Sequence, residues 1–141
     1  MKTIFYLFFI NCIVVTNILG QITSQRDFDD FLNLYPAIKN MKRIETSNQQ
    51  NMIYYISKKD PSISWSRGTN VFQGKMHTFD QFSITRKDVI YKLSCNTMSD
   101  HFEFSVSKKV GRQWLQYKPF KRSLSFLPKK MRVFVKYPVR L

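Results

Sequence analysis

The chain has two histidines, His77 and His101, and histidine is the side chain that most often acts as a general acid or base. A cation such as Lys75 or Lys92 could stabilise a phosphoryl transition state beside them, which would give a nuclease-like pair. Their spacing matches no catalytic motif, however, and histidines at a protein surface or strand edge would produce the same pattern. The pair alone therefore does not predict an enzyme.

Two carboxylates follow these histidines closely, at Asp80 and Glu103. Two imidazoles and two carboxylates are enough ligands for zinc, although a solvated strand face explains the same residues. The sequence also lacks a nucleophile elbow and a Cys-x-x-Cys pair, and it has only four glycines from which to build a phosphate-binding loop. We therefore expect a protein that is not an enzyme and that uses no metal and no cofactor.

Positive charge is concentrated in the last part of the chain, residues 104–141. This stretch has eleven Lys or Arg and no Asp or Glu, whereas residues 21–103 have eleven basic and nine acidic side chains. The excess is larger than the net charge of roughly 2 to 8 that keeps a small domain soluble. We therefore predict an anion-binding surface formed by Lys108, Lys109, Arg112, Lys118, Lys121, Arg122, Lys129, Lys130, Arg132, Lys136 and Arg140.

The first twenty residues have the pattern of a secretory signal peptide. Lys2 is followed by an apolar run from Ile4 to Ile10, and the small residue Gly20 is a suitable cleavage site. Cleavage there would leave a secreted, extracellular chain of residues 21–141 with a formal charge of +13, because Lys2 is removed. An uncleaved membrane anchor is the alternative interpretation. No second apolar run is long enough to span a bilayer.

Cysteine use is unusual for a secreted protein, because Cys12 lies in the signal and Cys95 is left alone. An odd cysteine can form an intermolecular disulfide, and Cys95 would then make a homodimer. Alternatively, Cys95 is a small buried hydrophobe, since it shares one face of a predicted strand with Tyr91 and Leu93.

Residues near the new N-terminus predict one amphipathic helix. Ser24 is a typical N-cap, and acidic residues follow it in the first turn. Apolar side chains at 28, 31, 32 and 35 have helical spacing, and Pro36 limits the helix. We also expect residues 37–43 to form a further helical turn or two.

From Met52 onward, the apolar period changes to two, which is typical of strands. We predict strands at residues 52–56, 63–65, 76–84, 89–95, 101–107, 113–117 and 131–137, with a further short one at 124–127. Short strands with turn signals every eight to twelve residues are typical of all-β domains. The sequence therefore predicts a mainly β, single-domain antiparallel sandwich or barrel of about seven to eight short strands, with a short N-terminal helix.

An anionic extracellular partner follows from the basic stretch. A sulfated glycan such as heparin, or the cell surface, is the partner we predict first; nucleic acid and an anionic membrane surface are further polyanions. Exposed aromatics among the charges, such as Trp114, could stack on sugars or bases. A second hypothesis is an effector or cytokine-like ligand of a protein receptor, in which the charge only steers association.

A third hypothesis is a precursor of cationic peptides, because several dibasic pairs punctuate the chain. The strand pattern argues against it, since several of these pairs lie beside strands that the core needs.

Mass spectrometry of the secreted protein tests the signal and precursor hypotheses together. We expect one dominant species that comprises residues 21–141. Fragments that end at Lys130 would instead indicate processing, and retention of residues 1–20 would indicate an anchor.

Overall fold

The structure is a computed structural model, and it describes residues 21–44 and 51–136, with side chains as far as residue 132. The predicted signal peptide and Arg140 lie outside the described residues. The elements, in chain order, are α2 (Gln25–Leu34), the 3-10 helix η1 (Ile38–Asn40), β1 (Met41–Ile44), β2 (Met52–Ser57), β3 (Ile63–Phe72), β4 (Lys75–Thr85), β5 (Val89–Asn96), β6 (His101–Val110), β7 (Gln113–Gln116), β8 (Phe120–Ser123), the 3-10 helix η2 (Leu124–Phe126) and α3 (Lys129–Lys136).

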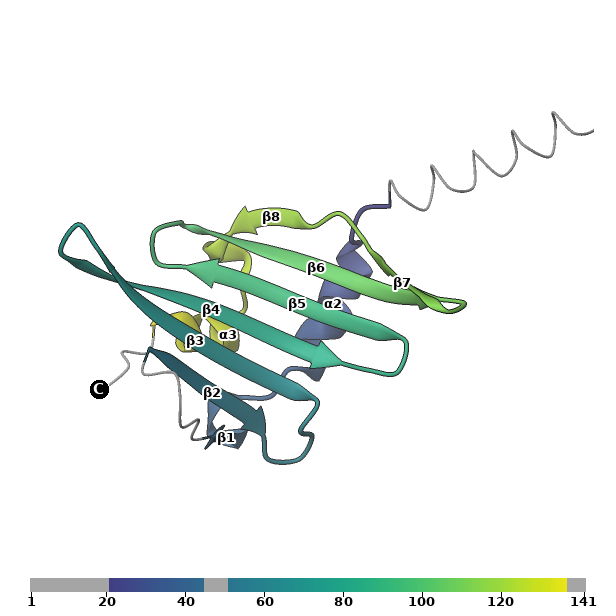
Figure 1. The fold of residues 1–141 in the computed structure, drawn as a ribbon, viewed down its shortest axis with the longest axis horizontal. Coiled ribbons are helices and arrows are strands. Elements are labelled where there is room, and N and C mark those ends of the chain that lie inside the picture. Colours follow the sequence, from purple (N-terminus) through teal and green to yellow (C-terminus); the bar gives the residue numbers. More distant parts are fainter. Residues whose placement is uncertain (1–20, 45–50, 137–141) are drawn as a thin grey trace, which may run out of the picture.

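The eight strands form one antiparallel sheet in which β1 to β7 follow one another in sequence order (Figure 1). Two short strands share the outer edge of β6, because β8 pairs with residues 101–104 and β7 pairs with residues 107–110. Consecutive antiparallel strands need only short turns, which agrees with the predicted turn signals. The prediction of a mainly antiparallel β protein with a short N-terminal helix is therefore confirmed, whereas the choice between sandwich and barrel stays a prediction.

Helix α2 begins where the sequence predicted, with a capping box at Ser24. The Ser24 hydroxyl oxygen accepts a hydrogen bond from the Asp27 amide (3.1 Å), and the Asp27 carboxylate accepts one from the Ser24 amide (3.3 Å). Phe28, Phe31 and Tyr35 are buried on one side of the helix. The Tyr35 hydroxyl also donates to the carbonyl of Ser64 in β3 (2.7 Å), so the end of the helix is tied to the sheet.

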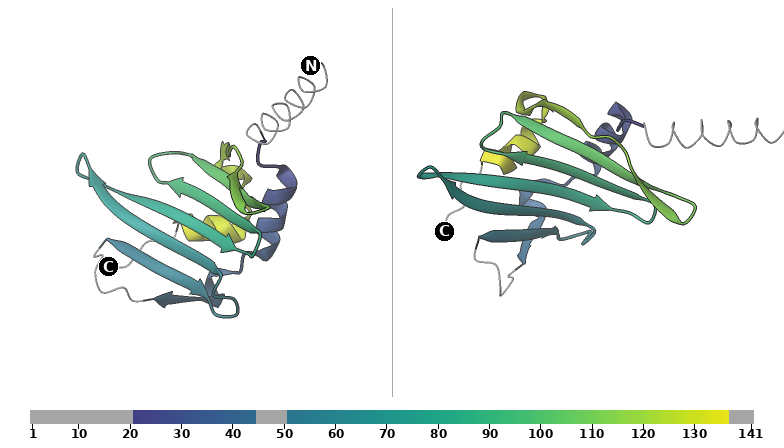
Figure 2. Two further views of the ribbon diagram at one scale, coloured as in Figure 1. Left: turned by 45° about the vertical axis from the view of Figure 1, so that its right-hand side comes forward. Right: turned by 45° about the horizontal axis from the view of Figure 1, so that its top comes forward.

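The core lies between the sheet and the helices, which pack on the same face of the sheet (Figure 2). One row of directly opposed residues crosses six strands on this face: Tyr55, Trp65, Phe82, Leu93, Phe104 and Phe120. Phe28 of α2 lies on this row, with its ring centroid 5.1 Å from that of Phe104 and 5.5 Å from that of Phe120. Aromatic contacts of this kind add to the free energy of burial, so they hold α2 on the sheet.

Two predicted strands near the C-terminus are wrong. Residues 131–137 were predicted as a strand, but residues up to Lys136 form helix α3, and residues 124–127 contain η2. Pro128 tolerates a helix start, and its carbonyl accepts hydrogen bonds from the amides of Met131 (2.9 Å) and Arg132 (3.1 Å). Met131 is fully buried against the core, so packing selects the helix over the alternating pattern.

Smaller differences concern the ends of the sheet. The helical turns expected at residues 37–43 shorten to η1, and β1 follows as an edge strand. Strand β8 was not predicted at all. Both edge strands are four residues long, which is too short for a clear alternating signal.

A buried ion pair joins β3 and β4 within the core. Arg67 Nε donates to Asp80 Oδ1 (2.7 Å), and the two side chains are 2 % and 0 % exposed. Trp65 Nε1 donates to the same carboxylate oxygen (2.8 Å), and the Arg67 guanidinium lies 5.1 Å from the centroid of the Trp65 ring. Burial raises the pKa of Asp80, and the hydrogen bond and charge of Arg67 oppose this rise.

Asp80→Asn should lower the free energy of unfolding by about 3–5 kcal/mol, because it removes the buried carboxylate charge that the Arg67 guanidinium contacts. Asp60→Asn is the control, since the ion pair between Asp60 and Arg86 lies at the surface (3.0 Å) and should contribute only about 0–1 kcal/mol. Urea unfolding at neutral pH measures both losses. Equal losses in the two variants would show that the buried Arg67–Asp80 pair contributes no more to the free energy of unfolding than the surface pair does.

Candidate functional site

The predicted basic residues do not all project from one face of the sheet. In β8, Lys121 is paired with Glu103 and Arg122 is paired with Phe102. Phe102 is buried under the helices, so Arg122 lies on the helix-covered face and Lys121 on the opposite face, which we call the open face. Alternation along the strand thus separates two cations that are adjacent in the sequence.

Two of the predicted lysines, Lys108 and Lys130, contact helix α2. Lys108 Nζ lies 2.8 Å from Asp27 Oδ1 and 5.1 Å from the centroid of the Tyr117 ring. Lys130 Nζ donates to the carbonyl oxygens of Leu32 and Tyr35, at the C-terminal end of α2, where the helix dipole favours a cation. These two lysines therefore help to attach α2 to the sheet and to α3.

Arg122 also has a packing role, because its guanidinium lies 4.7 Å from the centroid of Phe120 and 5.9 Å from that of Phe126. Arg132 is half-buried, and its Nε is buried without a hydrogen-bond partner among the described residues. The side chain of Lys136 is not described. Among the predicted cations on β8 and α3, Lys121, Arg122 and Lys130 thus contact other groups of the protein, whereas Lys129 is exposed.

The remaining cations surround the edge strand β7. Lys109, Arg112 and Lys118 are exposed, and no ion pair joins them to a described acidic side chain. Trp114 lies directly opposite Lys109 in the β6–β7 hairpin and is 45 % exposed. We call these four residues the β7 edge. Its three cations, together with the exposed Lys129 of α3, are available to a partner.

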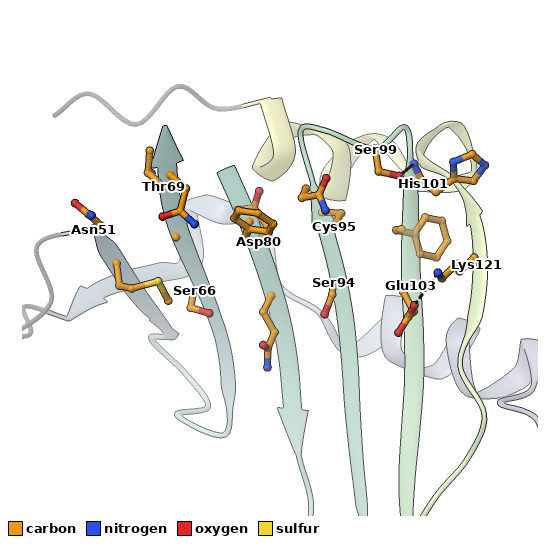
Figure 3. Close-up of a pocket in the computed structure, with 17 residues that line it drawn as sticks. Asn51, Ser66, Thr69, Asp80, Ser94, Cys95, Ser99, His101, Glu103 and Lys121 are labelled. Carbon is orange, nitrogen blue, oxygen red and sulfur yellow. Dashed lines mark hydrogen bonds and ion pairs between the residues drawn. The ribbon is translucent and has the colours of Figure 1, made fainter. Parts of the chain in front are cut away.

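A groove of about 650 Å³ lies on the open face of the sheet (Figure 3). Its floor follows one row of directly opposed residues across β3, β4, β5, β6 and β8: Ser66, Gln81, Ser94, Glu103 and Lys121. Figure 3 shows Ser66, Ser94 and Glu103 at one level of their strands, with the helices behind the sheet. Apart from Glu103 and Lys121, these residues were missed from the sequence, although their small polar side chains occupy alternate strand positions.

The rim of the groove contains amides and apolar side chains. Asn51 and Asn70 are exposed. In the row next to the floor, Gly68 of β3 lies between Met52 of β2 and Phe79 of β4. A Cβ atom on Gly68 would lie 2.8 Å from the Met52 sulfur, so glycine allows Met52 to cover this position. Phe79 is 41 % exposed, which is a large apolar surface for a strand residue beside polar neighbours.

The residues of the suggested catalytic and metal sites are not brought together. His101 lines the groove, where its Nδ1 contacts a carboxylate oxygen of Asp100, whereas His77 lies in β4 and has β5 between it and β6. Two strand spacings amount to roughly 10 Å. Asp80 is paired with Arg67 in the core and Glu103 points to the open face, so the two carboxylates lie on opposite sides of the sheet.

Cys95 lies in the core beside Asp80 and is 6 % exposed. Burial raises the pKa of its thiol to about 12, and the nearby Asp80 charge acts in the same direction. A thiol in such a site is almost fully protonated at neutral pH and therefore a poor nucleophile. Of the two interpretations of Cys95, the geometry favours the buried hydrophobe, because an intermolecular disulfide would require the core to open.

Comparisons with protein families, with curated proteins and with solved structures find no match to this chain. Within the described residues, no helix is long and apolar enough to cross a membrane. The β7 edge and the groove are therefore the two candidate binding surfaces of this protein.

Asp27 of α2 forms an ion pair with Lys108 of the basic stretch. Burial alone would raise the pKa of Asp27, but hydrogen bonds from Lys108 and Ser24, together with the Lys108 charge, lower it below its ordinary value of 3.8. An acid whose pKa is lowered by folding stabilises the protein above its unfolded pKa, and this stabilisation is lost as the pH falls through the folded pKa.

Asp27→Asn should lower the free energy of unfolding at pH 7 by about 1 kcal/mol, the usual size of a lost helix-cap interaction. The difference from wild type should shrink as the pH falls below 3.8, because the Asp27 carboxyl is protonated first in the unfolded chain and, at still lower pH, in the folded protein. Urea unfolding at pH 7 and pH 3 measures the change, with the exposed Asp30→Asn as the control. A loss that is the same at both pH values would contradict a role for the Asp27 charge.

Proposed function

We propose that this protein is a secreted, non-catalytic binding protein that attaches to an anionic extracellular partner, a sulfated glycan or the cell surface, through its basic C-terminal third. The observation that carries the proposal is the β7 edge. Three exposed cations, which form no ion pair with an acidic side chain of residues 21–44 or 51–132, flank an exposed tryptophan there, in a stretch of 38 residues that has no acidic side chain. Repulsion among these like charges is relieved when a polyanion binds.

Both chemical features of the β7 edge suit a sulfated sugar chain. Arg and Lys form charge-assisted hydrogen bonds with sulfate oxygens, as they do with phosphate and carboxylate. The Trp114 indole offers a flat apolar face with one N–H donor, which can pack on a sugar ring between sulfate groups. The lysines that hold α2, by contrast, contribute mainly to the stability of the fold.

The placement of the three dibasic pairs nearest the C-terminus weakens the precursor hypothesis. Lys108–Lys109 lies in β6, Lys121–Arg122 in β8 and Lys129–Lys130 in α3. A protease needs an extended, accessible backbone, and these segments are hydrogen-bonded within elements that cover the core. Binding by the intact chain is therefore the function that we propose.

Affinity for immobilised heparin at neutral pH tests the proposal. The wild-type protein should elute only at salt well above physiological, because several cation contacts release many counter-ions. Replacing Lys109, Arg112, Lys118 and Lys129 by Glu should shift elution to much lower salt and weaken the salt dependence.

The matched control replaces Lys42, Lys59, Lys75 and Lys87 by Glu, which changes the net charge equally at exposed positions elsewhere. It should shift elution much less. An equal shift in both variants would show that heparin responds only to net charge, and elution of the wild type at low salt would overturn the proposal.

A further inference from the structure

The groove on the open face has a different chemistry from the β7 edge. Four of the five floor residues, Ser66, Gln81, Ser94 and Glu103, place hydrogen-bonding side chains on four adjacent strands. Neighbouring strands are about 4.8 Å apart, so the row presents a polar group at regular short intervals across the sheet. Such a line of groups fits an extended ligand that offers hydroxyls at similar intervals.

The polar groups of the floor are available to a ligand. The described residues provide no hydrogen-bond partner for the side chains of Ser66, Gln81 or Ser94, and Gln81 and Ser94 are exposed. Hydroxyls and amides can each donate and accept hydrogen bonds. Sugar hydroxyls have the same double capacity, so floor and ligand would satisfy each other without either needing charge.

Phe79 provides an apolar surface at the rim. It lies on the open face between Gly68, which Met52 covers, and Asn96, and it is 41 % exposed. The C–H face of a sugar ring can pack on an exposed aromatic ring, while its hydroxyls reach the polar floor. Most concave ligand sites combine an apolar contact with a few well-placed polar groups in this way.

The charges of the groove argue against other ligands. Glu103 and Lys121 compensate each other at 3.6 Å, so the groove has no excess of cations for a sulfated or phosphorylated chain. The serine and amide floor does not suit an apolar ligand. Strands β3 to β6 are paired on both sides, so a peptide could not add to them as a further strand.

We propose that this groove binds an uncharged oligosaccharide segment, with Phe79 stacked on a sugar ring and with Gln81, Ser94 and Ser66 hydrogen-bonded to its hydroxyls. This site is separate from the β7 edge, and its binding does not depend on salt. A glycan-bearing surface could then be held by charge at one place and recognised by its neutral sugars at another.

The test applies the full-length secreted protein to an array of unsulfated, non-sialylated oligosaccharides in 0.5 M NaCl. At this salt concentration the range of charge interactions falls to a few ångströms. At least one neutral oligosaccharide should bind, and titration calorimetry with it should give the same affinity at low and high salt. Phe79→Ala and Gln81→Ala should each weaken that affinity about tenfold.

Matched controls lie on the same sheet. Phe72→Ala removes an exposed aromatic from the same hairpin outside the groove, and Gln113→Ala removes an exposed amide from β7; neither should change the affinity. The variant in which Lys109, Arg112, Lys118 and Lys129 are replaced by Glu should lose heparin and keep the neutral sugar, which separates the two proposals. Absence of any neutral ligand on the array, or an equal loss in Phe72→Ala and Phe79→Ala, would overturn the inference.

Discussion

The structure depends on the burial of one face of a single antiparallel sheet beneath helices α2 and α3. Aromatic and aliphatic side chains from six strands form one continuous row on that face, and Phe28 and Phe31 of α2 pack against it. Because side chains alternate along every strand, this burial also determines what lies on the other face. Each residue between two core positions must point to the open side, where water or a ligand can meet it.

This constraint explains both candidate binding surfaces. Four floor residues of the groove directly follow or precede Trp65, Phe82, Leu93 and Phe104 in their strands. The strand pairing that aligns the core residues therefore also aligns the floor residues. At the β7 edge, Lys109 alternates with Lys108, which contacts Asp27 on the helix side, whereas Arg112 lies in the turn between β6 and β7 and Lys118 follows β7. The buried Arg67–Asp80 pair is an ionic contact within the otherwise mostly apolar core, and it joins β3 and β4 beneath the end of the groove.

Much of the fold followed from local patterns. The capping box of Ser24 and Asp27 and the helical spacing of the apolar residues after it marked α2. Period-two alternation marked β2 and β4 to β7 within a few residues, whereas the strand predicted at residues 63–65 continues as β3 to Phe72. The same alternation misled at residues 131–137, because Met131, Val133 and Val135 are spaced as in a strand. Only the fit of Met131 into the core, beside a helix start at Pro128, favours a helix there.

The sequence by itself determined that the chain is mainly antiparallel β with an N-terminal helix, and that its charge lies at one end, because periodicity and composition are local properties. The tertiary structure alone decided which cations are engaged with α2 and which remain at the β7 edge. It also decided that five polar residues from five strands form one groove floor. Strand register sets these relations, and register arises from contacts between residues that are far apart in the chain.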